Sequence, residues 1–314
     1  MKVLRGISGL NYSLVHPVLT IGNFDGVHLG HQKIIGLAVE KAKARNGQSV
    51  TFTFRPHPQV ALRPHLQLQL LSTYDEKLEQ LEKLGVDLVI EEPFSREFSS
   101  TGPEQFFTEV LLKRLGAEAI VVGYDFAFGR ERNGHLEVLE ALSKAAGVEL
   151  TIVPPQRMGS DVVSSSKIRQ NLLGGNVEQA GRLLGRPFSY RGVVIKGDAR
   201  GRTLGFPTAN LKIEDKLVIS HGVYATRVLL EGKIFPSVTN VGIRPTFEME
   251  GTAPHILVET HLLNQNIDLY GRTLEVQFIS KIRNEEKFQN LNELRAQIQR
   301  DIEEASQRLI SNPL

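Results

Sequence analysis

Two histidines stand three residues apart near the N-terminus, in the glycine-rich segment Gly22-Asn23-Phe24-Asp25-Gly26-Val27-His28-Leu29-Gly30-His31. Side chains three apart share one face of a helix, and imidazole N–H groups can stabilise charge that develops on a phosphate. The glycines let a ligand approach the backbone closely, and free N–H groups at a helix start attract anions. The segment therefore indicates a nucleotide-phosphate site. The alternatives are a tight packing turn, an incidental surface pair, or a metal site, for which no third ligand lies nearby in the sequence.

Two later segments carry groups of the same chemical kind. Asp125, in Gly123-Tyr124-Asp125-Phe126-Ala127-Phe128-Gly129, follows an apolar run and can bind a ribose, a nucleobase or a metal-bound phosphate. In Ser164-Ser165-Ser166-Lys167-Ile168-Arg169, the serines offer hydroxyls and the two cations can neutralise phosphate charge. The simpler interpretations are a turn aspartate and a helix start that serine caps.

A second group of candidate residues lies in the other half of the chain. Thr208 and Asn210, in Phe206-Pro207-Thr208-Ala209-Asn210, point the same way if the segment is extended. Their oxygen atoms suit Mg²⁺, and Glu259 adds a carboxylate inside a β-rich run. Taken alone, the segment with Thr208 and Asn210 is typical of a surface hairpin loop. Glu259 alone is typical of an exposed residue on a strand. The glycine-rich stretch before Phe206 can wrap phosphates with backbone N–H groups, and its candidate contacts are Gly197, Arg202 and Gly205.

The first half of the chain alternates short apolar runs with stretches of helical spacing. The predicted strands are 18–21, 50–54, 88–90, 119–122 and 150–153, and the predicted helices are 30–45, 75–84, 103–115, 136–146 and a stretch ending near 184. This alternation predicts an α/β fold, a Rossmann-like domain with a parallel sheet covered on both faces. Ligands of such sheets bind at the carboxyl ends of the strands, where the candidate segments of this half lie.

In the second half, strand-like runs follow one another without helices between most of them. They cover 192–196, 222–230, 235–241, 255–262 and 274–279. This spacing predicts an antiparallel β-barrel or sandwich. A C-terminal helix, predicted over 290–310 from apolar residues at helical spacing, should pack on it. Gly185-Arg186-Pro187 interrupts the helical pattern, so we predict two domains, 1–185 and 186–314.

Composition limits the classes of function. The 314 residues suit about two domains. Lys and Arg number 37 against 35 Asp and Glu, so nothing indicates a nucleic-acid or membrane-surface partner. The absence of cysteine excludes disulfides, thiolate nucleophiles and cysteine-ligated zinc. No run approaches the ~20 apolar residues of a membrane span, and the N-terminus does not resemble a secretory signal. We therefore expect a cytoplasmic protein with small-molecule partners.

Taken together, these motifs resemble a known family. His28-Leu29-Gly30-His31 is similar to the His-x-Gly-His signature of the nucleotidyltransferase superfamily and lacks the Gly-Lys-Ser/Thr of a Walker loop. With the segments 123–129, 164–169 and Phe54-Arg55-Pro56-His57-Pro58, it resembles the adenylyltransferase half of bacterial bifunctional riboflavin kinase/FAD synthetases. The Thr208 and Glu259 segments, with 268–271, 281–283 and 286–288, resemble riboflavin kinase. The resemblance covers nearly all of both domains.

The resemblance implies two ATP-dependent reactions, riboflavin to FMN in the barrel and FMN to FAD in the N-terminal domain, with Mg²⁺ as cofactor. Glu259 would be the general base of the kinase, whose metal would be held by Thr208 and Asn210. His28, His31 and Arg169 would act on the ATP phosphates in adenylylation. The implied ATP- or phosphate-binding residues are Gly22, Asn23, Phe24, Asp25, Gly26, Gly30, Asp125, Ser164, Ser165, Lys167, Gly197, Arg202, Gly205, Thr208 and Asn210. The implied flavin-binding residues are Phe54, His57, Pro58, Phe126, Arg283 and Phe288.

The chain departs from the family pattern at two positions, Ala127, where the family usually has Arg, and His135, where Asp is common. Two other functions therefore stay open. One is a riboflavin kinase whose first domain no longer adenylylates. The other is a non-catalytic flavin- or nucleotide-sensing module, against which the intact candidate groups in both halves argue. The oligomeric state is also open, a homo-oligomer included.

Overall fold

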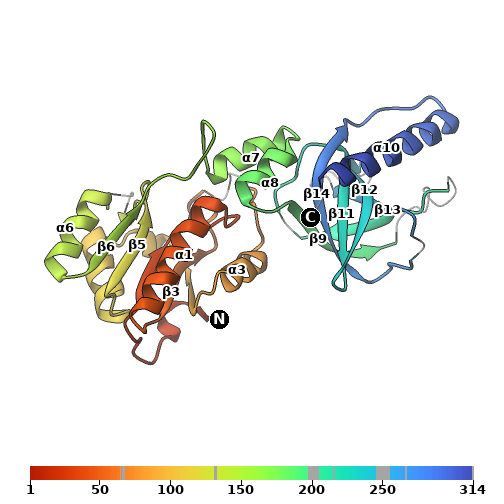
Figure 1. Cartoon of the computed structure of the whole chain (residues 1–314). Coiled ribbons are helices and arrows are strands. Elements are labelled where there is room, and N and C mark those ends of the chain that lie inside the picture. The colour runs from red at the N-terminus through yellow and green to blue at the C-terminus, as the bar shows by residue number, and fades with distance from the viewer. Residues whose placement is uncertain are drawn as a thin grey trace. The chain divides into compact units, whose positions relative to one another are not determined.

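The computed structural model describes residues 1–63, 65, 68–130, 133–196, 205–214, 216–244, 255–265 and 267–312. Two predicted site residues, Gly197 and Arg202, lie outside the described residues. The chain divides into two compact units, Met1–Ser165 and Ser166–Leu314 (Figure 1). No helix in the described part of the chain is long and apolar enough to cross a membrane.

The two units are divided at 165/166, whereas the predicted domain boundary is 185/186. The helical stretch between these positions was predicted to belong to the first domain. This stretch consists of α7 (Ser165–Leu173) and α8 (Val177–Leu184). α8 packs against β9 (Phe188–Ile195) and β14 (Thr273–Arg283), and the backbone N–H of Ser220 donates to the carbonyl of Leu172 at 3.1 Å. These contacts group both helices with the barrel that follows them.

The first unit is built on a six-stranded sheet in the order β1-β4-β3-β2-β5-β6, in which every pair is parallel. The strands are β1 (Lys2–Arg5), β2 (Val18–Ile21), β3 (Ser49–Arg55), β4 (Leu88–Pro93), β5 (Ala119–Gly123) and β6 (Glu149–Val153). The predicted parallel sheet is confirmed. β1 was not predicted, because this short edge strand begins and ends with an exposed charged residue.

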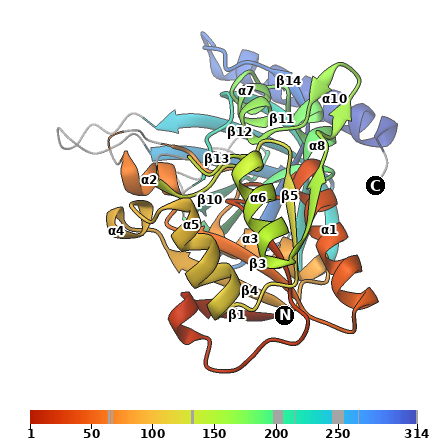
Figure 2. The same cartoon turned by 90° about the vertical axis from the view of Figure 1, so that its left-hand side faces the viewer.

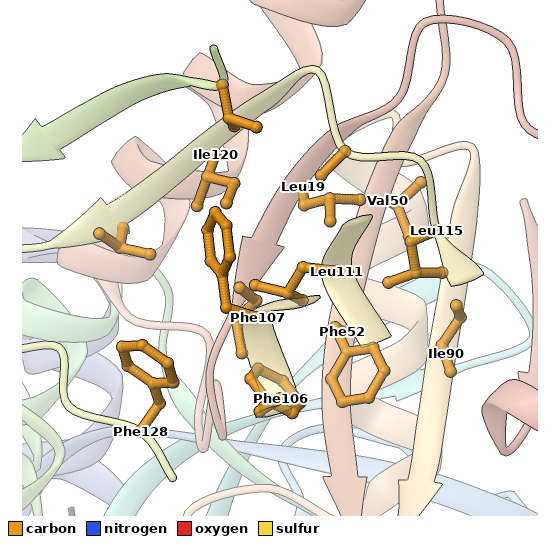
Figure 3. Packing of buried hydrophobic residues seen from close by; sticks show 14 of the residues in the cluster. Leu19, Val50, Phe52, Ile90, Phe106, Phe107, Leu111, Leu115, Ile120 and Phe128 are labelled. Atoms are coloured by element: carbon orange, nitrogen blue, oxygen red, sulfur yellow. The ribbon is translucent and has the colours of Figure 1, made fainter. Parts of the chain in front are cut away.

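Helices cover both faces of this sheet, as predicted (Figure 2). On one face, α1 (Leu29–Ala44) and α3 (Tyr74–Lys83) bury side chains such as Ile35 and Leu81 against Val89. On the other, η2 (Phe106–Arg114) and α6 (Leu136–Ala146) pack on β2, β3, β4 and β5 (Figure 3). The shorter elements are η1 (Ile7–Gly9), α2 (Pro58–Leu62), α4 (Arg96–Ser99), α5 (Pro103–Gln105) and the strand pair β7 (Arg157–Met158) and β8 (Asp161–Val162).

The helix predicted over 103–115 has an unusual winding. After one turn of α5, η2 continues as a π-helix, in which N–H groups bond to the carbonyl five residues back. Just after it, the N–H of Leu115 donates to the carbonyl of Val110 at 3.0 Å. The buried residues Phe106, Leu111 and Leu115 accordingly recur at intervals of five and four along the chain (Figure 3).

The second unit is a closed antiparallel barrel in the order β10-β13-β12-β11-β14-β9, with β9 paired to β10. Its other strands are β10 (Ala209–Ile213), β11 (Gly222–Leu230), β12 (Lys233–Arg244) and β13 (His255–Leu262). Of the two predicted architectures, the barrel is therefore confirmed. The predicted C-terminal helix is α10 (Leu291–Ser311), which packs Ala305 and Leu309 on Ala225 and Ile279.

Candidate nucleotide and flavin sites

His28 and His31 lie where β2 leads into α1. The Nδ1 atom of His28, the N-cap residue of α1, accepts a hydrogen bond from the backbone N–H of His31 at 3.3 Å. The two rings stack with their centroids 3.6 Å apart. A Cβ atom on Gly30 would come within 3.2 Å of the His28 ring, so glycine at this position leaves room for the stacked pair.

The imidazole of His31 is held in its neutral form. Burial lowers the pKa of His31 well below its usual value, and the nearby His28 and Lys77 lower it further. Its Nδ1 atom is buried and has no hydrogen-bond partner among the described residues. A neutral imidazole keeps one N–H to donate, and a bound triphosphate would raise the pKa again because it is negatively charged.

Residues 22–27, which we term the nucleotide turn, have a strained backbone. Phe24 and Val27 have positive φ angles of 51° and 41°, a region that bulky residues rarely adopt. The carboxylate of Asp25 accepts hydrogen bonds from the backbone N–H groups of Leu71 at 2.9 Å and Ser72 at 3.3 Å. In return, the Ser72 hydroxyl accepts from the N–H of the residue after Asp25 at 3.1 Å. Asp25, predicted as a phosphate-site residue, thus anchors the turn to segment 71–72.

A cavity of about 10 Å³ lies between the nucleotide turn and the Phe54–His57 segment. Asn23 and Asp25 line it from the first side and Phe54 and His57 from the second. Its other lining residues are Leu70, Ser72, Thr73, Tyr74 and Lys77. Of these, Lys77 was missed by sequence analysis. A signal was present, because Lys77 stands four residues before the buried Leu81 and places a charge on the apolar face of α3.

The predicted flavin-binding residues of the first unit divide into two groups. Phe54, which packs against a cluster of phenylalanine rings, and His57, whose backbone N–H donates to the Tyr74 hydroxyl at 2.9 Å, both reach the cavity. Pro58 begins α2, and Phe126 stacks on the ring of Phe128 at 5.5 Å. Neither of these last two residues lines the cavity.

The remaining predicted phosphate-site residues of this half lie on two segments. Asp125 is exposed and its Oδ1 atom lies beside Gly123, where a Cβ atom would be 3.1 Å away. The Ser165 hydroxyl donates to the backbone carbonyl of Asp25 at 3.1 Å, so within the first unit Ser165 lies beside the nucleotide turn. Lys167 and Arg169 follow on α7 and belong to the second compact unit.

In the barrel, strand register brings the predicted kinase residues together. Glu259 on β13 stands directly opposite Asn210 on β10 and, on its other side, opposite Asn240 on β12. Directly opposed residues have Cβ atoms about 4.5–5.5 Å apart, so two amides flank the carboxylate. Thr208 comes just before β10 and is half-buried. Asn240 was not predicted as a site residue, because only the pairing of β12 with β13 places it here.

His261, two residues beyond Glu259, ties the Phe206–Asn210 segment to β13. Its Nδ1 atom lies 2.8 Å from the carbonyl oxygen of Pro207. A carbonyl can only accept, so Nδ1 carries the hydrogen. The His261 ring also meets the Phe206 ring edge-on, with centroids 6.0 Å apart. Both contacts are made by residues that immediately precede Thr208 in the chain.

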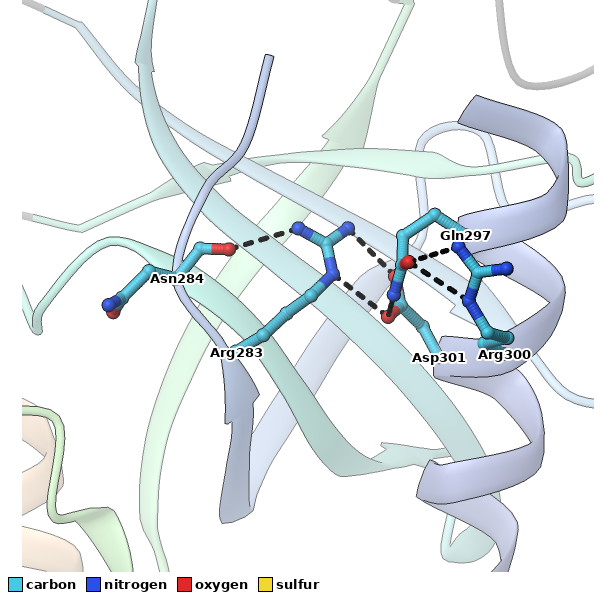
Figure 4. A network of polar contacts seen from close by, with 5 residues as sticks. All are labelled: Arg283, Asn284, Gln297, Arg300 and Asp301. Atoms are coloured by element: carbon cyan, nitrogen blue, oxygen red, sulfur yellow. Dashed lines mark hydrogen bonds and ion pairs between the residues drawn. The ribbon is translucent and has the colours of Figure 1, made fainter. Parts of the chain in front are cut away.

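The predicted flavin residue Arg283 lies in a polar network with α10 (Figure 4). Its guanidinium donates two hydrogen bonds to Asp301, at 2.9 and 2.8 Å, and one to the carbonyl of Asn284 at 2.9 Å. Asp301 is buried and also accepts from Gln297 at 2.9 Å. Phe288 lies nearby, its ring centroid 5.6 Å from the guanidinium carbon. Arg283 therefore fixes α10 to the end of β14.

A larger cavity, of about 450 Å³, lies beside the first half of α10. Gly205 and Phe206 line it from one side, and α10 contributes Asn292, Arg295, Ala296 and Gln299. Phe206, which lines this cavity, stands two residues before Thr208 in the chain. The volume falls within the range typical of small-molecule pockets, and sequence analysis had not selected any of the α10 residues.

Each of the two units matches a known protein family. The FAD synthetase family model matches residues 13–167, and the riboflavin kinase family model matches residues 184–309. The bifunctional riboflavin kinase/FMN adenylyltransferase of Escherichia coli K12 is 39% identical over 303 residues, 96% of each chain. The enzyme of the same name from Bacillus subtilis 168 is 37% identical, over 92% of this chain and 91% of its own.

A solved structure agrees in fold. The crystal structure of a protein from Streptococcus pneumoniae, named as a macrolide-efflux protein, is 31% identical, with a TM-score of 0.88 over 97% of this chain and 98% of its own. The two family matches follow the order of the sheet unit and the barrel, and the curated relatives match across both. The chain belongs to the bifunctional riboflavin kinase/FMN adenylyltransferase family.

Proposed function

We propose that this chain phosphorylates riboflavin to FMN in its barrel and adenylylates FMN to FAD in its sheet unit, with ATP as the donor in both steps. The observation that carries the proposal is that one chain holds two distinct sets of candidate catalytic groups. One is the stacked His28–His31 pair at the start of α1. The other is Glu259 in register with Asn210. A sensing module would need neither set.

In the kinase step, Glu259 takes the proton of the riboflavin 5′-hydroxyl as that oxygen attacks the γ-phosphorus of ATP, and ADP leaves. Most of the catalysis is positioning and charge neutralisation. Mg²⁺ fits the donors available, because it prefers oxygen ligands and shares them with substrate phosphates. Thr208 and Asn210 would hold it; among the described residues no group of three or more His, Asp or Glu forms a metal site. The ion, when bound, would neutralise phosphate charge.

In the adenylylation step, a phosphate oxygen of FMN attacks the α-phosphorus of ATP, and pyrophosphate leaves. The nucleophile is already an anion, so the step needs no general base. His28 and His31 donate hydrogen bonds to the ATP phosphates at the N-terminus of α1, which favours an anion. Asp25 acts by anchoring the nucleotide turn. We assign the opposite side of the triphosphate to Ser164 and Ser165; the phosphate roles of Lys167 and Arg169 stay predictions.

The remaining assignments complete the proposal. Phe54 and His57 contact the flavin in the sheet unit, Phe288 contacts it in the barrel, and Asp125 contacts the nucleoside of ATP. We place the functional boundary at 185/186, next to the start of the riboflavin kinase match at residue 184. The partners are riboflavin, FMN and ATP, without nucleic acid or membrane, and we place the protein in the cytoplasm.

Incubation with riboflavin, ATP and Mg²⁺, followed by chromatography of the flavins, tests the proposal. The wild type should form FMN and then FAD. His28→Ala should accumulate FMN without FAD, because only the adenylylation step uses His28. Glu259→Gln should fail to phosphorylate riboflavin and should still convert added FMN to FAD.

Each outcome selects one function. FMN without FAD from the wild type would favour a kinase with an inactive first domain. Flavin binding without any turnover would favour a sensing module. If either variant lost both activities while its circular dichroism spectrum stayed native, the assignment of two separate sites would be wrong.

A further inference from the structure

The cavity beside the nucleotide turn joins the two sides that adenylylation must connect. Asn23 and Asp25 belong to the turn proposed to bind ATP, whereas Phe54 and His57 belong to the segment proposed to contact FMN. The bond that forms links a phosphate oxygen of FMN to the α-phosphorus of ATP. The cavity is the place where the described residues of these two sides meet.

The size of the cavity limits what can enter it. Its volume of about 10 Å³ holds one water-sized group. A flavin ring is far too large, whereas a single oxygen of a phosphate is about the size of a water molecule. Ser72, Thr73 and Tyr74 also line the cavity at the start of α3, and their hydroxyl groups can donate to a phosphate oxygen. The cavity thus suits a phosphate oxygen better than any other part of the substrates.

Lys77 is the cation that lines this cavity. Its side chain is only 4% exposed, and Nζ donates to the Thr53 hydroxyl at 3.0 Å. That hydroxyl in turn lies 3.3 Å from the carbonyl of Asn23, to which it donates. An ammonium has three N–H donors, and Thr53 accepts from one of them. The cavity wall therefore presents an ammonium group with two further N–H donors, beside the Asp25 carboxylate of the nucleotide turn.

Charged groups of both signs surround Lys77. Burial lowers the pKa of Lys77 most, Asp25 raises it, and Arg55 and Arg5 lower it, so that the pKa is about 8. Arg55 and Arg5 both pair with the buried Glu91. An anion that entered the cavity would favour the charged form of the lysine.

We propose that the ammonium group of Lys77 binds the 5′-phosphate of FMN and holds it for attack on ATP. The proposal rests on the adenylylation step proposed above and assigns to it a residue that contacts the substrate. Its competitor is a structural role, in which Lys77 only holds Thr53 and, through Thr53, the nucleotide turn. The two roles differ in what removing the charge does to stability and to each substrate.

Lys77→Met removes the charge and keeps the length of the side chain, and Lys77→Arg keeps the charge. Lys83→Met is a matched control, because Lys83 is an exposed lysine on the same helix. We expect Lys77→Met to raise the KM for FMN in adenylylation about tenfold or more and to change the KM for ATP less than twofold. Lys77→Arg should recover part of the FMN affinity, and Lys83→Met should match the wild type.

Two further measurements separate binding from structure. The melting temperature of free Lys77→Met should equal or exceed that of the wild type, because a buried charge is removed. The KM for FMN of the wild type should rise above about pH 8 as Lys77 loses its proton, and that of Lys77→Arg should stay level there. The titratable and charged groups that face Lys77 or its cavity are Asp25, His31, His57, Tyr74, Arg55 and Arg5.

Riboflavin phosphorylation by the same samples serves as the internal control. If the wild type makes FAD and Lys77→Met has an unchanged KM for FMN, the Lys77 proposal is overturned and the proposed function stands. A lower melting temperature with equal rises in both KM values would assign Lys77 a structural role and also overturn the proposal. A wild type that makes FMN but no FAD would overturn both.

Discussion

In the sheet unit the candidate histidines come from segments that follow strands, whereas in the barrel Glu259 and the two amides opposite it stand on the strands themselves. His28, His31 and His57 lie beyond the ends of β2 and β3. Asn210, Asn240 and Glu259 are cross-strand neighbours within β10, β12 and β13. The first site therefore depends on turn conformation and on anchors such as Asp25, and the second depends on register.

This difference predicts different weaknesses. A change that displaces one turn should disable the sheet site and leave the sheet intact, because the parallel strands do not depend on the turn. The barrel site should tolerate changes in loops, because the hydrogen-bond ladder places Glu259 opposite its two amides. The following predictions test that contrast, from the largest expected effect to the smallest.

Asp301→Ala should have the largest effect, and it tests whether the barrel site depends on register alone. The Arg283 and Asp301 side chains are only 16% and 4% exposed, and removing one partner of a buried ion pair costs about 3 kcal/mol or more. Denaturant unfolding of the barrel should shift by that amount, with an increased KM for riboflavin. Glu303→Ala, at an exposed position on the same helix, is the control. An unchanged unfolding curve for Asp301→Ala would contradict the role given to this pair.

Gly30→Ala should lower the rate of adenylylation about 100-fold, the effect expected when a phosphate-stabilising donor is displaced. The added Cβ would meet the His28 ring at 3.2 Å. Gly36→Ala in the same helix is the matched control, because a Cβ atom there meets nothing within 4 Å. It should raise stability by about 1 kcal/mol. Riboflavin phosphorylation should be the same in both variants, and a loss of kinase activity in Gly30→Ala would contradict the separation of the two sites.

Replacing His261 tests whether register alone places Thr208. Asparagine can supply an N–H close to the position of Nδ1, whereas glutamine extends past it. His261→Gln should therefore raise the KM for Mg·ATP in the kinase step about fivefold, the effect of one hydrogen bond, and His261→Asn should raise it less. Equal values for both variants and the wild type would mean that β10 alone positions the segment.

The smallest effect concerns His31 and acidity. Its pKa is lowered in the folded protein, so the unfolded chain binds a proton first as the pH falls through about 6.5. Keeping His31 neutral therefore costs no free energy of unfolding above this pH, whereas below it the folded state loses stability relative to the protonated unfolded chain. The free energy of unfolding of the sheet unit should therefore fall more steeply between about pH 6.5 and 5 in the wild type than in His31→Gln. Parallel curves would show that His31 is not the acid-sensitive group.

Local sequence patterns predicted much of both units. These patterns depend on neighbours within a few positions: the spacing of the histidines, the apolar strands, and the change after residue 185 from alternating helices and strands to successive strands. The predicted parallel sheet, barrel and C-terminal helix are confirmed. Features that depend on distant partners were not predicted. Lys77 lines the cavity only because α3 buries it beside Thr53, and Asn240 stands opposite Glu259 only because β12 pairs with β13. Arg283 was predicted as a flavin contact, and its attachment to Asp301 depends on where α10 packs.

The π-helical winding of η2 determines how this helix would respond to the deletion of one residue. Removing one residue from an α-helix turns every later side chain by about 100° about the axis, which takes the buried face off the core. In η2, deletion of the exposed Glu109 would place Phe106, Leu111 and Leu115 at positions i, i+4 and i+8, the spacing of an α-helical stripe. The ion pair of Glu109 with Lys113, at 2.7 Å, would be lost, at a cost of about 0.5 kcal/mol or less. This helix can thus become one residue shorter, by rewinding as an α-helix, with its aromatic core still buried.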